Sequence, residues 1–326
     1  MNTLYPLKFK PLFKEKIWGG KKIQSTLGLD FSPIVNCGEA WIISGVPGSE
    51  TKVSNGFLKG NNLNELVEVF MDDLLGERSF EKNQDVFPIL VKFIDANDWL
   101  SIQVHPDDNL AAKRKSGNGK TEMWYILEAE QNAELISGFS RQVDQKTYLK
   151  YLHDNRLKEI LNIEKVRNDD VFYIPSGRIH ALGPGILLTE IQQTSDITYR
   201  IYDWGRIDGQ GKSRELHIES ALEAIDFKFC DSYRTNYQRK QNKTSNLIDC
   251  PYFVTNLLDL DQTLEKDYSA LDSFVIYIVI KGAAVIQWDS AEESIRSGET
   301  LLIPAVMEKI IIKANPECKI LEVYIP

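Results

Sequence analysis

The sequence predicts a mainly β protein of two jelly-roll β-barrel domains, with short helical insertions in the first domain. The first observation is that short apolar runs rich in Ile, Val, Tyr and Trp recur along the chain between turn residues, which is typical of strands. The second is an internal sequence similarity. Residues 168–182 (NDDVFYIPSGRIHAL) and 297–311 (SGETLLIPAVMEKII) share an acidic turn, an apolar strand and a Pro followed by a small residue. Small barrels of this kind close their edges and leave a mouth for a ligand.

The elements of the first half follow from these patterns. Three stretches have helical spacing: 63–74, with Asn62 or Asn64 as N-cap and Gly76 as its end, then 148–161, and then 215–225. The strands are expected at the apolar runs EAWIIS (39–44), FPILVKFIDA (87–96), WLSIQVH (99–105), EMWYILEA (122–129), DVFYIP (170–175), ILLTEIQQ (186–193) and ITYRIYDW (197–204).

The chain is predicted to divide at a polar segment. Residues 231–246 hold no aliphatic side chain, which is typical of a linker or exposed loop. We therefore expect a domain over 1–235 with a helical insertion at about 139–165, a linker over 236–246 and a small all-β domain over 247–326. In the small domain the runs SFVIYIVIKG (273–282), AAVIQW (283–288), EKIIIKA (308–314) and KILEVYI (319–325) are expected as separate strands. Aligning the two echoing segments places Lys309 opposite His180, and Phe274 or Val275 opposite Glu122, so the second domain is expected to be a lid or brace without metal ligands.

Composition and charge exclude several classes of protein. The 326 residues carry a net charge of −9 and are 43% hydrophobic, which argues against nucleic acid or an anionic membrane as a partner and against disorder. No run of 18 apolar residues exists, and the N-terminus lacks the apolar core of a secretory signal. The four cysteines form no CxxC pair, so we expect reduced thiols and a cytoplasmic location. For the oligomeric state, a monomer is the default expectation.

One group of polar side chains in the first domain could bind a metal ion. Gln103 and His105 are two residues apart in a strand and therefore face the same side, and Pro106 ends that strand. Glu122 begins the next strand, and His180 follows the turn PSG. A lone strand histidine is more often a satisfied core residue, but this N/O donor set together suits Zn²⁺ or its neighbours Mn, Fe, Co and Ni, with a coordination position left open.

The motifs of the first domain resemble those of type I mannose-6-phosphate isomerases of the short bacterial form, within the cupin superfamily. The resemblance is carried, in the family's order, by KIWGG (16–20), GEAWIIS (38–44), LVKFIDANDWLSIQVHPDD (90–108), GKTEMWYIL (119–127), YIPSGRIHALGPG (173–185) and TEIQQTSDITYRIYDWGR (189–206). It implies two cupin-like barrels and a small-molecule sugar phosphate as partner.

The resemblance also implies roles for particular residues. It places one Zn²⁺ or similar ion on Gln103, His105, Glu122 and His180, although Gln103 lies outside the first metal shell in some short members. It makes Arg200 the catalytic arginine and assigns the substrate pocket to Lys92, Ser101, Lys120 and Glu190, with Trp18 nearby.

The implied reaction interconverts mannose 6-phosphate and fructose 6-phosphate through a cis-enediol. Its barrier lies mostly in negative charge that develops on the sugar oxygens, which a divalent cation and Arg200 would stabilise. Glu190 and a metal-activated water are the alternatives for the proton-shuttling base. Three other functions stay open: an Fe(II)-dependent cupin dioxygenase, a sugar-phosphate sensor without catalysis, and an isomerase of broader substrate range.

Overall fold

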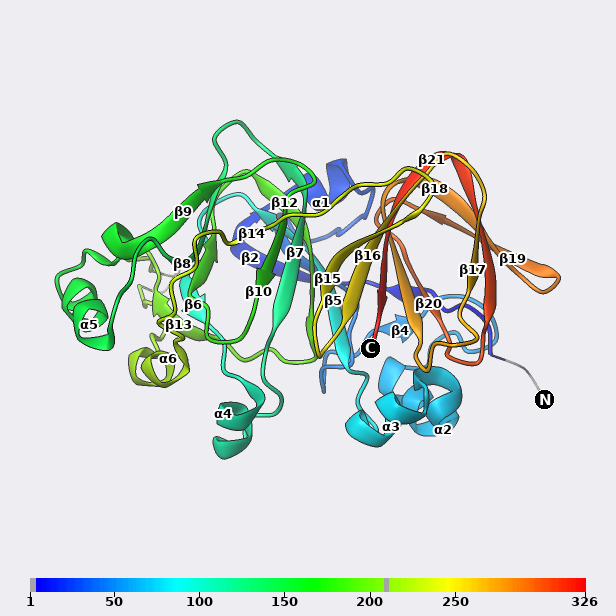
Figure 1. Ribbon diagram of the computed structural model, residues 1–326, viewed down its shortest axis with the longest axis horizontal. Coiled ribbons are helices and arrows are strands. Elements are labelled where there is room, and N and C mark those ends of the chain that lie inside the picture. The colour runs from blue at the N-terminus through cyan, green and yellow to red at the C-terminus, as the bar shows by residue number, and fades with distance from the viewer. Residues whose placement is uncertain (1–3, 208–210) are drawn as a thin grey trace.

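The computed structural model describes residues 4–207 and 211–326; residues 1–3 and 208–210, which fall in the predicted first domain, lie outside the described residues. Two β bodies lie side by side, one formed by the first two thirds of the chain and the other by the C-terminal third (Figure 1). Among the described residues, no helix has the length and apolar character required to cross a lipid bilayer.

The first body consists of two facing antiparallel sheets. The larger has, in spatial order, β14 (Arg234–Thr235), β10 (Val171–Ile174), β7 (Glu122–Ala129), β12 (Ile186–Gln193), β5 (Ile89–Ala96), β3 (Cys37–Ile43) and β2 (Leu12–Gly20). The smaller has β13 (Tyr199–Tyr202), β6 (Ile102–Val104), β11 (His180–Leu182), β8 (Glu134–Phe139) and β9 (Leu161–Lys165). The mainly β class is confirmed. In the part of the chain described, hydrogen bonds leave the two sheets open instead of joining them into a closed barrel.

The larger sheet is buried on both faces. Every residue of β5 and β12 is buried, because side chains alternate between the interior of the first body and the contact with the second. Ile94 and Leu188 belong to the interior cluster with Trp124, whereas Phe93 and Leu187 belong to the cluster shared with the C-terminal body. The smaller sheet is covered on its outer face by the helices α5 (Gln145–His153) and α6 (Ile218–Ala224) (Figure 1).

The C-terminal body is organised around two long strands. β18 (Val275–Trp288) and β21 (Lys309–Tyr324) pair along most of their length, and each was expected as two separate strands. Register shifts between Val279 and Lys281 and between Gly282 and Ala284 allow the pair to bend without interruption. The remaining strands are β15 (Thr244–Asp249), β16 (Val254–Leu260), β17 (Leu264–Asp267), β19 (Ala291–Arg296) and β20 (Thr300–Ile303).

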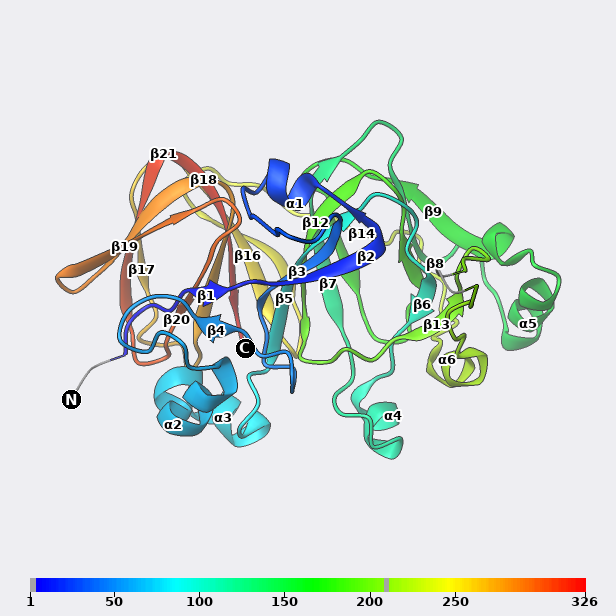
Figure 2. The same cartoon turned by 180° about the vertical axis from the view of Figure 1, so that it is seen from behind.

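The two bodies share one apolar cluster, so they pack as a unit. Phe274 lies in this interface, whereas Val275 points into the C-terminal interior. N-terminal segments also lie against the C-terminal body (Figure 2): α2 (Leu63–Leu75), α3 (Glu77–Asn83), and the small sheet of β1 (Phe9–Lys10) and β4 (Lys52–Val53). Arg78 of α3, for example, pairs with Asp272 at 3.0 Å.

The predicted helices are present with small shifts. Asn62 caps α2 in a capping box with Glu65, and Gly76 ends the helix. The helix predicted over 148–161 is divided into α5 and a 3₁₀ turn, η1 (Leu157–Ile160). In the insertion predicted over about 139–165, the last five residues form the strand β9. Among the described residues, three short helices that we did not predict are α1 (Lys22–Ser25), α3 and α4 (Asp108–Lys113).

The predicted linker is only partly without regular structure. β14 lies just before it, and β15 begins at Thr244, so that the last three residues of the predicted linker are part of this strand. The domain boundaries themselves stay a prediction, since residues from both sides of the polar segment contribute to the shared cluster.

Candidate active site

Three buried side chains meet between the two sheets of the first body. Glu122 Oε2 lies 3.5 Å from His105 Nε2, and Glu122 Oε1 lies 3.3 Å from His180 Nε2. The candidate ligand atoms of the three residues all lie within 4.8 Å of one another, and none of the three residues is more than 1% exposed. The strands β7 and β11 supply Glu122 and His180, and His105 follows β6 directly, as the sequence predicted.

The backbone fixes both imidazole rings. His105 Nδ1 lies 2.8 Å from the carbonyl oxygen of Ile197, and His180 Nδ1 lies 2.9 Å from that of Arg178. A carbonyl can only accept, so each ring donates from Nδ1 and leaves the lone pair of Nε2 directed at Glu122. This is the orientation in which histidine ligates metals in proteins.

The electrostatics of this group suit a cation. Burial lowers the pKa of His180 to about 4 and that of His105 well below its usual value, so both rings are neutral at pH 7. Burial and the nearby Glu190 charge raise the pKa of Glu122 to about 7. Within the described chain, His105 Nε2 and both oxygens of Glu122 are buried without a hydrogen-bond partner, although Lys120 Nζ forms an ion pair with Glu122 Oε2 at 3.2 Å. Because unpartnered buried polar atoms are destabilising, a divalent ion bound to them would stabilise the group.

Gln103 lies beside this group. Its Nε2 is 3.3 Å from His180 Nε2, so the amide nitrogen is the atom turned towards the histidine. Ligation would require the amide oxygen to take that place, and the two amide orientations are nearly isosteric. Gln103 as a metal ligand stays a prediction.

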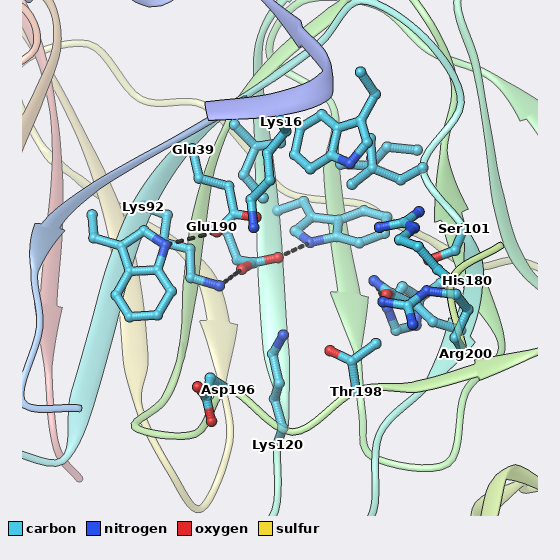
Figure 3. A pocket seen from close by; sticks show the side chains of 18 residues that line it. Lys16, Glu39, Lys92, Ser101, Lys120, His180, Glu190, Asp196, Thr198 and Arg200 are labelled. Carbon is cyan, nitrogen blue, oxygen red and sulfur yellow. Dashed lines mark hydrogen bonds and ion pairs between the residues drawn. The ribbon is translucent and has the colours of Figure 1, made fainter. Parts of the chain in front are cut away.

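A cavity of about 350 Å³ opens next to the candidate metal ligands. Figure 3 shows Lys92 and Glu190 on one side of it and Ser101, His180 and Arg200 on the opposite side. Two rows of cross-strand neighbours form these walls. On the larger sheet the row runs from Trp124 through Glu190 and Lys92 to Trp41, and on the smaller sheet it runs from His180 through Gln103 to Arg200.

The Lys92–Glu190 ion pair lies in the cavity wall formed by the larger sheet. Lys92 Nζ lies 2.9 Å from Glu190 Oε1 and donates to Gln192 Oε1 at 2.7 Å, and Trp124 Nε1 donates to Glu190 Oε2 at 3.0 Å. Although burial raises the pKa of Glu190, the charges of Lys92 and Lys120 lower it more, to about 2. Glu190 is therefore ionised across the neutral range. Lys92 interrupts the apolar run FPILVKFI (87–94), where a buried charge needs a partner, and Glu190 is that partner.

The predicted cations stand in different environments. Lys120 lies 3.2 Å from Glu122 Oε2 and is 5% exposed. Arg200 donates from Nη1 to the carbonyl oxygen of Glu215 at 2.9 Å. Its backbone N–H donates to His217 Nδ1 at 3.2 Å, so His217 helps to hold the strand that carries Arg200.

The remaining predicted pocket residues, Trp18 and Ser101, also line the cavity, and both are at most 4% exposed. Among the further lining residues that sequence reasoning missed are Lys16, Glu39, Trp41, Asp196, Thr198 and Arg214. Glu39 and Trp41 could have been found from the sequence, because Glu39 is a charged residue in a predicted apolar strand and lies two residues from Trp41, on the same face. In the structure, Trp41 Nε1 donates to Glu39 Oε2 at 2.7 Å. For Arg214 the sequence offered no signal.

The fold and the His105–Glu122–His180 group define a cupin-type protein with a candidate metal site. The family model for the type I phosphomannose isomerase catalytic domain matches residues 6–136, and that for the mannose-6-phosphate isomerase cupin domain matches residues 242–325. The chain belongs to the type I mannose-6-phosphate isomerase family, a family of aldose–ketose isomerases.

Two curated relatives and one crystal structure support this membership along the whole chain. The mannose-6-phosphate isomerase ManA of Bacillus subtilis is 34% identical over 322 residues, covering 97% of this chain and 98% of that protein. The mannose-6-phosphate isomerase of Streptococcus mutans is 33% identical over 322 residues, covering 96% and 99%. A crystal structure of the mannose 6-phosphate isomerase from B. subtilis has a TM-score of 0.89 at 33% identity, covering 98% of this chain and 99% of that one.

Proposed function

We propose that this protein interconverts D-mannose 6-phosphate and D-fructose 6-phosphate, with a proton moving between C2 and C1 through a cis-enediol. Membership of the family supports the activity. The observation that carries the assignment to this cavity is the buried His105–Glu122–His180 group beside a cavity lined by cations.

We propose Zn²⁺ as the ion for these three residues, with Gln103 as a fourth ligand. A donor set of neutral imidazoles, a carboxylate and an amide oxygen suits Zn²⁺ among divalent metals. When bound, such an ion supplies positive charge that polarises the sugar oxygens. The remaining steps belong to the residues of the chain.

Arg200 is proposed to bind the substrate and to stabilise negative charge on it, since its guanidinium stays protonated. Glu190 is the candidate base. Its carboxylate is held in place by Lys92 and Trp124 and is ionised at neutral pH, but a pKa of about 2 makes it a weak proton acceptor. Lys92 donates hydrogen bonds to both Glu190 and Gln192, so protonation of the Glu190 carboxylate would also alter the contact between Lys92 and Gln192.

The pocket walls are proposed to exclude water and orient the sugar chain. Trp18 and Ser101 line the cavity. Lys120, whose Nζ lies 3.2 Å from Glu122 Oε2, lies between the two walls (Figure 3). A water-poor cavity strengthens every charge interaction within it.

We also propose that the enzyme is cytoplasmic and monomeric, and that residues 1–235 form its catalytic domain. All four cysteines are free thiols, as a reducing compartment permits. The C-terminal body would then brace the larger sheet.

The testing experiment is an anaerobic coupled assay of mannose 6-phosphate turnover by the Zn²⁺-loaded protein, before and after chelation. The proposal expects turnover without oxygen that chelation abolishes and Zn²⁺ restores. A dioxygenase would be inactive without oxygen, and a sensor would bind the sugar phosphate without converting it. Either outcome, or full activity after chelation, would contradict the proposal.

A further inference from the structure

We propose that Arg214, held in place by Asp203, is a second substrate-binding cation that acts with Arg200 on the phosphate group of the sugar phosphate. This inference deepens the proposed function and rests on it. It concerns a residue that follows β13 in the chain and reaches the cavity wall from outside both sheets.

The distribution of charge in the cavity singles out Arg200. Three of the lining cations already have a carboxylate partner: Lys16 with Glu39 at 3.2 Å, Lys92 with Glu190 at 2.9 Å, and Lys120 with Glu122 at 3.2 Å. Arg200 forms no ion pair with any residue of 4–207 or 211–326, and its Nε is buried without a hydrogen-bond partner. A dianionic phosphate would supply the missing partner.

Arg214 is fixed so that part of its guanidinium stays available. Its Nε donates to Asp203 Oδ2 at 2.7 Å and its Nη2 to Asp203 Oδ1 at 2.5 Å, which is a two-point contact. Asp203 is only 6% exposed and is also paired with Arg206 at 3.4 Å. Asp203 thus engages Nε and Nη2 of Arg214 and leaves Nη1 outside this contact, and the residue lines the cavity. Asp203 is thus a positioning residue for Arg214.

The two guanidinium groups lie close enough to repel each other. Burial lowers the pKa of Arg200 most, and the charge of Arg214 lowers it further. Two like charges on one wall are unfavourable unless an anion binds between them, and the protein as a whole carries a net charge of −9. This cationic pair is therefore a local exception that suits an anionic group of the substrate.

The position matches the length of the substrate. Arg200 lies opposite Gln103 across one strand pair, and Gln103 lies opposite His180 across the next. Neighbouring strands are about 4.8 Å apart, so the backbone of Arg200 is roughly 10 Å from that of His180. An open-chain hexose phosphate whose O1 and O2 lie near the candidate metal ligands can extend its phosphate along this row towards Arg200 and Arg214.

The test compares Arg214→Ala with wild type and with the control Arg296→Ala, all as full-length, Zn²⁺-loaded proteins. Arg296 has a side chain 76% exposed on the C-terminal body, and its replacement removes the same charge. The measurements are the inhibition constant of inorganic phosphate, KM and kcat for mannose 6-phosphate, metal content and the unfolding midpoint. Arg214→Ala should raise the phosphate inhibition constant and KM by roughly 10- to 100-fold, as expected for a charged hydrogen bond, and change kcat only a few-fold. The control should leave all values unchanged.

An unchanged phosphate inhibition constant in Arg214→Ala would overturn the inference, even if the unfolding midpoint and kcat fell, because that pattern marks a purely structural residue. If this variant does not fold, Arg214→Gln replaces it, since it keeps a donor for Asp203 and loses the charge; the same criteria apply. Calorimetric titration with inorganic phosphate separates the two proposals. A wild type that binds phosphate through Arg214 but converts no mannose 6-phosphate would refute the proposed function alone.

Discussion

The buried ion pair of Lys92 and Glu190 should contribute several kcal/mol to stability, and Lys92→Met tests this directly. Methionine keeps most of the side-chain volume and removes the charge. Lys92 and Glu190 have side chains only 7% and 5% exposed, so the variant leaves a buried carboxylate whose remaining direct donor is Trp124. Removing one partner of a buried pair typically lowers stability by about 3–5 kcal/mol.

The pKa of Glu190 gives an independent magnitude. A carboxyl group whose pKa falls from its usual value of 4.5 to about 2 on folding gains about 3 kcal/mol, and Lys92 supplies the largest lowering charge. Because the folded pKa is the lower one, this stability is complete above pH 4.5 and is lost as the pH falls towards 2. At pH 7 the variant should therefore be less stable by about 3 kcal/mol, and the difference should shrink below pH 4.5.

The assay is thermal unfolding at pH 7 and along a series from pH 6 to pH 3. For a chain of 326 residues the unfolding entropy is about 0.7 kcal/mol/K, so a loss of 3 kcal/mol lowers Tm by about 4 °C. The matched control is Lys281→Met, since Lys281 and Glu317 form a pair 62% exposed on both sides, which solvent screens, so its loss should leave Tm nearly unchanged. Equal Tm values for Lys92→Met and wild type, or additive effects of Lys92→Met and Glu190→Met in a double-mutant cycle, would refute the reasoning.

Three further outcomes are expected. His180→Ala should keep the fold but bind less than a tenth of the wild-type metal, as elemental analysis after dialysis would show; wild-type metal content would remove His180 from the site. Arg200→Ala should retain the metal and lower kcat by about 100-fold or more, and a near-wild-type kcat would end its assignment. Tyr268→Phe removes the hydroxyl that donates to buried Glu322 Oε1 at 2.6 Å in the C-terminal body. It should lower stability by about 1.5–3 kcal/mol in denaturant unfolding and leave kcat unchanged, whereas an altered kcat would assign that body a direct part in catalysis.

The candidate ligands were predictable because strand periodicity is local. Side chains two residues apart share a face, which placed Gln103 with His105, and the turn residues PSG placed His180 just after the end of a strand. Lys120 could be placed beside Glu122 for the same reason, and the structure puts their charged atoms 3.2 Å apart.

Other features depend on contacts that the sequence does not encode locally. The length of β18 and β21 depends on bulges that let one strand continue through a bend, so each was predicted as two strands. The open edges of the sheets depend on which strands pair, and the sequence does not give that order. Arg214 lines the cavity while Asp203 holds its guanidinium by two hydrogen bonds, a contact that no spacing rule predicts.

The most direct test of the metal centre is the metal content of chelator-stripped protein after equilibrium dialysis against Zn²⁺, for wild type and Glu122→Gln. We expect one ion per chain in the wild type and almost none in the variant, with both proteins folded by circular dichroism. Equal metal content in the two proteins, or no bound ion in a folded and active wild type, would contradict the assignment of His105, Glu122 and His180 as the ligands.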